Sequence, residues 1–403
     1  MKLEKIGLMP RHLTLLTAGL GYLGNVFCVN LTYVFKKEPF LDFGIAEAQL
    51  ASANSTLLII QHVGIFLGVI LFGSLADRRG RMAMLFISVG TYSVATFLSG
   101  LVHNYYLFQV LRFVVGLGVA SELGIGLVLI CEIFSREKRT FLIIFIAFCG
   151  FMGMFLLSIL AKSFHWRTLY IMGGLLGLLI MFFRFSTFES DIFLKSNQLK
   201  NQLKKSLILP LLRKRKIYYL IICILPSYLV TASSIFVGTT YFKELKVSAG
   251  QSLLFFSIGG GLGLIFISLL SKKIKSRKKA ITLCITLLLI LASIYAFIKP
   301  TSIHSFLIIN FLFGIFVTYQ FELLALTIEQ FGTNIRALAT TLVFGAGRAS
   351  VFLFSLIIPI LNLIVKDLLM SVFILDFIFF CAALWAISKI KEDFCRDLSF
   401  VDE

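Results

Sequence analysis

The chain has 403 residues, of which 59% are hydrophobic and only 14% charged, and its formal net charge at pH 7 is +18. A soluble protein of this length could not bury so much apolar surface, so the composition excludes a soluble enzyme or binding domain. The basic charge does not indicate a nucleic-acid partner, because most of it is concentrated in alternate loops between apolar segments.

Twelve apolar segments along the chain are each long enough to cross a bilayer as a helix. The sequence therefore predicts an all-α polytopic membrane protein. The predicted spans are residues 12–34, 50–76, 82–101, 105–134, 140–162, 167–186, 217–241, 248–270, 279–298, 303–330, 335–361 and 366–389.

The lysines and arginines fix the predicted orientation. If the N-terminus is inside, 27 of the 38 fall in cytoplasmic segments and 8 in external loops. This bias predicts that both termini are cytoplasmic. The basic segment 187–216 divides the chain into a first bundle of residues 1–186 and a second of residues 217–403, and we expect this linker to rest on anionic lipid head groups.

A repeated elbow relates the two predicted bundles. Glu132 ends one apolar segment and Arg139 opens the next, and the same pattern returns 197 residues later at Glu329 and Arg336. Two parallel halves of similar architecture are the simplest source of this repeat, and many secondary transporters place a substrate site between two such halves.

The loop between the second and third predicted helices carries a recognisable motif. Gly73, Asp77, Gly80 and Arg81, with Arg78 between them, resemble the helix 2–3 signature of the major facilitator superfamily, although Met82 departs from its last position. This resemblance implies two pseudo-symmetric six-helix bundles, transport by alternating access and a charged cytoplasmic gate. The corresponding segment of the second half, residues 271–279, is basic but has no aspartate. The gate residues implied are Asp77, Arg81, Glu132, Arg139, Glu329 and Arg336.

The fourth predicted helix contains Arg112 and, ten residues later, Glu122, a spacing that resembles the metabolite:proton symporters. An ionised side chain inside a bilayer costs several kcal/mol unless it is paired or hydrated, so each one is a candidate for function. Glu122 and Glu322 are the predicted proton carriers, because the first helix has no carboxylate for this role. The alternative is that each pairs with a neighbouring helix and holds the bundle together.

Arg348 gives the best prediction of a substrate site. It follows Arg336 by twelve residues, a spacing similar to that of organic-anion and aromatic-acid:proton symporters. A guanidinium there offers two parallel hydrogen bonds to a carboxylate. The alternative is a salt bridge to Glu322 or Asp376. Further predicted contacts with the substrate are Arg112, Asn25, Asn30, Tyr33, Tyr319 and Gln320.

Two other polar residues within spans are interpreted as structural. Asp376 belongs to the twelfth helix, which lies at the periphery of this fold, and His62 is a lone histidine on an apolar helix. The seven cysteines are scattered singly and predict neither disulfides nor a metal site.

The predicted function is proton-coupled import of a small organic anion or metabolite by a monomer in a bacterial inner membrane. A proton-driven exporter is an alternative, although Gly150 and Gly153 lack the proline of the drug-antiporter signature. An uncoupled facilitator or exchanger of the same fold is another. No nucleotide-binding loop, metal cluster or nucleophile constellation is found, so we expect neither a cofactor nor enzyme activity.

Overall fold

The computed structural model describes residues 2–135, 138–184, 208–234 and 247–392, and within these ranges the chain is helical and has no strand. The predicted linker, residues 187–216, lies mostly outside the described residues. The helices are α1 (Lys2–Val34), α2 (Glu38–Asp42), η1 (Glu47–Gln49), α3 (Leu50–Arg79), α4 (Arg81–Leu101), α5 (Tyr105–Val119), α6 (Glu122–Ile133), α7 (Arg139–Leu160), α8 (Trp166–Arg184), α10 (Ile208–Arg213), α11 (Arg215–Ala232), α13 (Ala249–Ile274), α14 (Arg277–Phe297), α15 (Ile303–Val317), α16 (Tyr319–Gln330), α17 (Arg336–Val365) and α18 (Leu368–Lys389).

Twelve helical stretches in the described part of the chain are long and apolar enough to cross a membrane. They confirm the all-α class and the twelve predicted spans, with boundaries that shift by a few residues. The seventh, predicted over residues 217–241, is described as an α-helix from Arg215 to Ala232. The chain is therefore an integral membrane protein.

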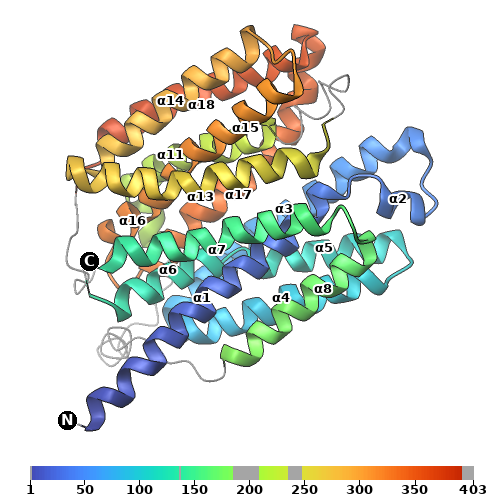
Figure 1. Cartoon of the computed structure of the whole chain (residues 1–403). Helices are drawn as coiled ribbons and strands as arrows, with labels where there is room; N and C mark the ends of the chain where they lie inside the picture. Colours follow the sequence, from blue (N-terminus) through green and yellow to red (C-terminus); the bar gives the residue numbers. More distant parts are fainter. Residues whose placement is uncertain (1, 136–137, 185–207, 235–246, 393–403) are drawn as a thin grey trace.

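The helices form two groups that lie side by side (Figure 1). In the N-terminal half, α1 packs against α7, α3 against α5 and α4 against α8; in the C-terminal half, α11 packs against α17 and α18, and α13 against α15. The halves meet where α17 contacts α3 and α6 and where α13 contacts α7. The start of α1 and the end of α18 lie at the same end of the bundle, called the termini end below (Figure 1).

Local sequence signals explain where several helices begin. The Asn104 side chain caps α5 by accepting a hydrogen bond of 3.1 Å from the backbone N–H of Leu107, and the Asp367 carboxylate caps α18. Such caps satisfy backbone donors that have no partner within the helix. Gly80 separates α3 from α4 with φ of 110°, a conformation that residues with a Cβ rarely adopt.

Two spans predicted as continuous helices are broken. The span 105–134 is divided into α5 and α6 at Ala120 and Ser121, and the span 303–330 is divided into α15 and α16 at Thr318. The Val119 carbonyl at the first break accepts a hydrogen bond of 2.9 Å from Asn25 on α1. Irregular backbone at membrane depth is stable only where protein or a cavity satisfies its polar groups, and such breaks often border transport sites.

Candidate functional site

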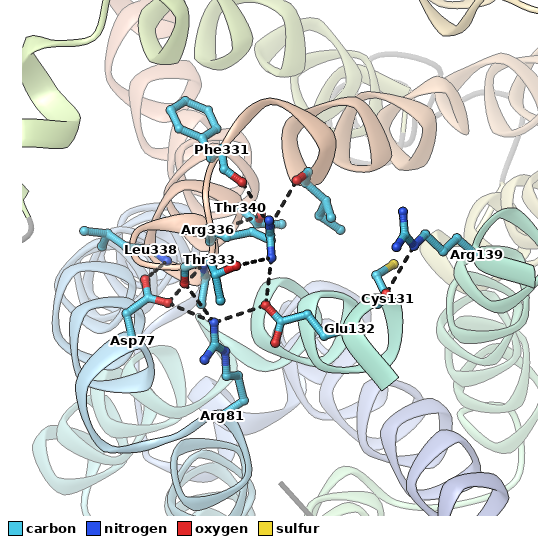
Figure 2. Close-up of polar contacts among 12 residues, drawn as sticks. Asp77, Arg81, Cys131, Glu132, Arg139, Phe331, Thr333, Arg336, Leu338 and Thr340 are labelled. Carbon is cyan, nitrogen blue, oxygen red and sulfur yellow. Dashed lines mark hydrogen bonds and ion pairs between the residues drawn. The ribbon is translucent and has the colours of Figure 1, made fainter. Parts of the chain in front are cut away.

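Four charged residues predicted to form a gate gather at the termini end: Asp77, Arg81, Glu132 and Arg336, called the termini-end network below (Figure 2). Asp77, near the end of α3, accepts hydrogen bonds from the backbone N–H groups of Ala337 (3.3 Å) and Leu338 (2.8 Å). These donors belong to the first turn of α17, where the positive end of the helix dipole stabilises a carboxylate. The contact joins the two halves.

Glu132 is the centre of the termini-end network (Figure 2). Its Oε1 accepts one hydrogen bond of 3.2 Å from Arg81 in its own half and another of 2.9 Å from Arg336 in the other half. The side chains of all three residues are fully buried. Arg81 also donates to the Thr333 carbonyl of the second half, 3.0 Å away. Two cations and two carboxylates thus hold the halves together at this end.

The two elbows are not equivalent, although their sequences repeat. Glu132 bridges the halves, whereas Glu329 accepts two hydrogen bonds of 3.0 Å from Arg277 within its own half. Arg139, the counterpart of Arg336, donates to the Cys131 carbonyl at 3.1 Å, again within its own half.

The other motif residues have separate places in the structure. Gly73 is buried on α3 beside Leu338 and Thr341 of α17, where a Cβ would lie 3.2 Å from the Leu338 side chain. Arg78 is exposed near the end of α3. It therefore lies outside the network.

Glu122 forms a buried ion pair with Arg184, the last residue of α8. One hydrogen bond of 3.3 Å joins Arg184 Nη1 to Glu122 Oε2, and a second, shorter one joins Nη2 to Oε1. Arg184 also donates to the carbonyls of Leu85 (2.9 Å) and Thr17 (3.1 Å), so it connects three other helices. Gly21 leaves the required space, because a Cβ there would lie 2.1 Å from Arg184 Nη2.

Glu322 has a similar environment in the second half. It accepts hydrogen bonds from Arg277 and from the Ser271 hydroxyl (3.2 Å). A neighbouring guanidinium stabilises the ionised form of a carboxylate. Both predicted proton carriers, Glu122 and Glu322, therefore have the environment of structural ion pairs, which is the alternative that the sequence left open, and their proton-carrying role stays a prediction.

A cavity of about 90 Å³ lies between the halves, away from these ion pairs. Of the predicted substrate contacts, Asn30, Tyr33, Gln320 and Arg348 line it. Its remaining walls are mainly aromatic and aliphatic. They are formed by Tyr22, Val26, Val29, His62, Ile65, Ala147, Gly150, Phe151, Met154, Tyr228, Thr231, Ala232, Phe256, Phe321 and Val351.

Arg348 is the cation of this cavity lining. Its Nη1 donates a hydrogen bond of 3.1 Å to the Val119 carbonyl at the break between α5 and α6, and its guanidinium lies 4.7 Å from the centre of the Phe344 ring. Among the described residues no carboxylate lies within ion-pair distance of Arg348; Glu322 is paired with Arg277, and Asp376 accepts a hydrogen bond from Ser233. The alternative of a salt bridge from Arg348 to either acid is therefore wrong.

Three predicted substrate contacts lie outside the cavity lining. Arg112 donates to the Ser99 hydroxyl at 3.0 Å and stacks on the Tyr170 ring at 4.7 Å, within the N-terminal half. Asn25 supports the break in the fourth span through the Val119 carbonyl. Tyr319 donates to the Cys223 carbonyl at 2.9 Å. These contacts give the three residues supporting positions around the cavity.

Three residues take part in the site although the sequence does not predict a functional role for them: Arg184, Arg277 and His62. Arg184 is not among the predicted site residues and Arg277 falls within the basic segment 271–279, yet each forms an ion pair with a predicted proton carrier. The position of Arg277, 196 residues after Arg81, is close to the repeat offset and could have revealed it. His62 was interpreted as a structural histidine, and it is buried and hydrogen-bonded, but it also lines the cavity.

The comparisons with known proteins agree with this architecture. The family model described as Major Facilitator Superfamily matches residues 18–355. The solved structure of the proton:xylose symporter XylE, bound to 6-bromo-6-deoxy-D-glucose, is similar to this one with a TM-score of 0.78 and 16% sequence identity. The match covers 97% of this chain and 98% of the XylE chain. This likeness shows the fold.

Curated relatives are transporters of small metabolites. The sialic acid transporter NanX of Escherichia coli (strain K12) is 26% identical over 84% of each chain. The 4-hydroxybenzoate transporter PcaK of Pseudomonas aeruginosa is 33% identical over 34% of this chain and 31% of PcaK, and the putative niacin/nicotinamide transporter NiaP of Bacillus subtilis is 25% identical over 43% of each. The chain belongs to the Major Facilitator Superfamily and is a transporter of small metabolites.

The buried pair of Glu122 and Arg184 yields a stability prediction. Glu122→Gln leaves a buried guanidinium without its counter-charge, and we expect it to lower the free energy of unfolding by about 3–5 kcal/mol. Arg184→Gln has a comparable effect, and the double variant is less destabilised than the sum of the two by about 0.5–3 kcal/mol. Thermal unfolding of the purified protein in detergent measures all three.

Lys299→Gln is the matched control, because it removes a partly exposed ion pair with Asp367 at 3.3 Å. We expect this change to cost less than about 1 kcal/mol. A Glu122→Gln variant that unfolds at the same temperature as the unchanged protein would contradict the prediction.

Proposed function

We propose that this transporter imports a small organic anion together with a proton, as a monomer in a bacterial inner membrane. The observation that carries the proposal is the position of Arg348. A guanidinium at membrane depth is costly unless it is paired or faces water, and among the described residues Arg348 has no carboxylate partner. An anionic substrate in the cavity would supply the missing counter-charge.

The cavity lining favours a monocarboxylate with a flat, largely apolar body. Rings of Tyr22, Tyr228 and Phe321 are among those that form its walls, and Arg348 is the cation. Gln320 faces the same cavity with an amide oxygen that has no hydrogen-bond partner, so it is available to a substrate hydroxyl or ring N–H. The relatives named for 4-hydroxybenzoate and niacin support this class, since both compounds are flat aromatic monocarboxylic acids. The relative named for sialic acid supports the carboxylate alone, since that compound is a polyhydroxylated sugar acid.

The termini-end network is the proposed cytoplasmic gate. The bias of lysines and arginines toward the segments at this end supports a cytoplasmic orientation. Four hydrogen bonds of this network join the two halves, and Arg348 adds another bond between them at the cavity. On this assignment the structure represents a state closed to the cytoplasm, and breaking the network opens the cavity inward.

The proposed function is tested with purified protein in proteoliposomes and a pH-sensitive dye outside them. 4-Hydroxybenzoate, nicotinate and sialic acid are added separately to the outside. Symport removes protons together with the acid, so we expect the external pH to rise with at least one of them, and not in liposomes without protein.

The other outcomes distinguish the alternatives. Acidification of the outside would indicate antiport and favour the exporter. If the pH does not change while the labelled acid exchanges across the membrane, the protein is an uncoupled facilitator or exchanger, and the proposed coupling is wrong.

Arg348 yields a second prediction. Arg348→Gln removes the charge and the paired hydrogen bonds, which are worth about 1.5–3 kcal/mol when one partner is charged. We therefore expect the half-saturation concentration for acid counterflow to rise about 10- to 100-fold, with a smaller rise for Arg348→Lys. Lys299→Gln, which removes the ion pair with Asp367 at the other end of the bundle, is the control. An unchanged half-saturation concentration in both Arg348 variants would exclude direct binding.

The gate yields a third prediction. Glu132→Gln weakens two charge-assisted hydrogen bonds, each worth about 1.5–3 kcal/mol, so we expect the ratio of cytoplasm-open to cytoplasm-closed molecules to rise about 10- to 100-fold or more. The measurement is the distance distribution between spin labels at exposed positions 79 and 272, on opposite halves near the termini end. The labels are attached through Arg79→Cys and Lys272→Cys in a background without the native cysteines.

Glu122→Gln is the matched control for the gate, because it removes an ion pair inside one half. It should destabilise the protein without lengthening the distance between the labels. Equal distance distributions for Glu132→Gln and the unchanged protein would show that the network does not hold the closed state.

A further inference from the structure

His62 has a defined position and tautomer in the cavity wall. Its side chain is buried on α3, and its Nδ1 lies 2.7 Å from the Leu58 carbonyl oxygen of the same helix. A carbonyl can only accept, so Nδ1 carries a proton. Nε2 lies 2.9 Å from the Tyr33 hydroxyl on α1 and, in the neutral ring, accepts from it. A second proton can therefore be added only at Nε2, on the side of Tyr33.

The titratable and charged groups that share the cavity wall with His62 come from three neighbouring helices. Tyr33 lies on α1, Arg348 on α17 and Tyr228 on α11, and all of them line the same cavity. On α5, which packs against α3, Arg112 is bound to Ser99 and lies outside the cavity lining. In the described part of the chain no carboxylate lines the cavity, so Arg348 is the charge that acts on the imidazole from within it.

This arrangement differs from that of the predicted proton carriers. Glu122 and Glu322 would each have to leave a buried guanidinium before accepting a proton. His62 has no such partner: Tyr33 only needs to rotate its hydroxyl, which can donate to the neutral ring and accept from the protonated one. Histidine is also the residue type on the cavity wall whose ordinary pKa in water is closest to neutral pH.

We propose that His62 binds the transported proton and that Arg348 makes its binding depend on the substrate. In the empty cavity the guanidinium repels an imidazolium. When the substrate carboxylate binds Arg348, it neutralises this repulsion, and Nε2 of His62 takes up a proton while the Tyr33 oxygen accepts from it. Binding of the acid and of the proton favour each other to the same degree, because such coupling is reciprocal.

On this proposal the net charge of the cavity is the same before and after loading. The empty cavity contains the Arg348 cation and a neutral imidazole. The loaded cavity contains the same cation, the carboxylate anion and the imidazolium, so its net charge is unchanged. Transport of a monocarboxylate with one proton is then electroneutral, and it responds to a pH gradient but not to a membrane potential.

The inference rests on the proposed symport, and one set of experiments tests both. The full chain in proteoliposomes is supplied with whichever of 4-hydroxybenzoate, nicotinate or sialic acid the unchanged protein accumulates most strongly under an inwardly directed proton gradient. His62→Asn and His62→Gln are compared with it, because the first preserves a donor near the Leu58 carbonyl and the second an amide near Tyr33.

We expect both His62 variants to lose accumulation driven by the pH gradient and to equilibrate the acid at equal concentrations inside and outside. At equal pH and saturating acid both variants should still catalyse counterflow, because exchange of the acid needs no net proton movement. Their half-saturation concentration should rise, because a bound proton no longer favours binding of the acid. A potassium diffusion potential alone should drive no accumulation in the unchanged protein.

Contrary results would show whether the proposed symport or only the role of His62 is wrong. If the unchanged protein itself accumulates none of the acids under a proton gradient, symport is wrong and the role of His62 with it. If it accumulates acid and the His62 variants do so equally, only the role of His62 is wrong. It is also wrong if both variants lose counterflow, or if Glu122→Gln or Glu322→Gln abolishes coupling while the His62 variants retain it.

Discussion

The cost of a charge inside an apolar bundle is the constraint on which this structure depends. An ionised group at membrane depth must have a counter-charge, hydrogen-bond partners or water. Glu122 satisfies this requirement through Arg184, and Glu322 and Glu329 share Arg277. These pairs join helices within one half and make each half a stable unit. Glu132 is different, because one of its two partners belongs to the other half.

The repeated elbows show how one pattern can serve two purposes. In the first half, Asp77 accepts from the start of α17 and Glu132 accepts from Arg336, and these bonds exist only while the halves are together at the termini end. In the second half, the position that corresponds to Asp77 is occupied by the basic segment 271–279, and Glu329 pairs within its own half. Only one side of the pseudo-symmetric pair therefore carries the aspartate that binds across the interface. An asymmetric network can be released without unpairing the charges that stabilise each half.

The sequence alone predicted the parts of the structure that depend on composition and on the spacing of repeated residues. Apolar length predicted twelve spans, and the elbow repeat predicted two halves. The motif around Asp77 predicted a cluster of charged residues, and the structure brings four of its members together; their role as a gate stays a prediction. The breaks at Ala120 and Thr318 were not predicted, because no glycine or proline stands at either break and the cause lies in partners from other helices, such as Asn25. The partners of Glu122 and Glu322 were missed for the same reason: an ion pair is a property of packed helices, and a linear motif shows only one member of it.

The break in the fourth span connects the cavity with the closure of the halves. The Val119 carbonyl is available there because the helix ends, and it accepts from Asn25 of its own half and from Arg348 of the other. On the proposed function, a substrate carboxylate competes with this carbonyl for the guanidinium. A ligand shifts a conformational equilibrium only by its differential affinity for the two states. The hydrogen bond between Arg348 and Val119 exists only while the halves are close. A carboxylate that takes the place of the Val119 carbonyl therefore removes one hydrogen bond that stabilises the closed state. Substrate binding and the loss of one hydrogen bond between the halves are then two consequences of the same guanidinium changing its partner.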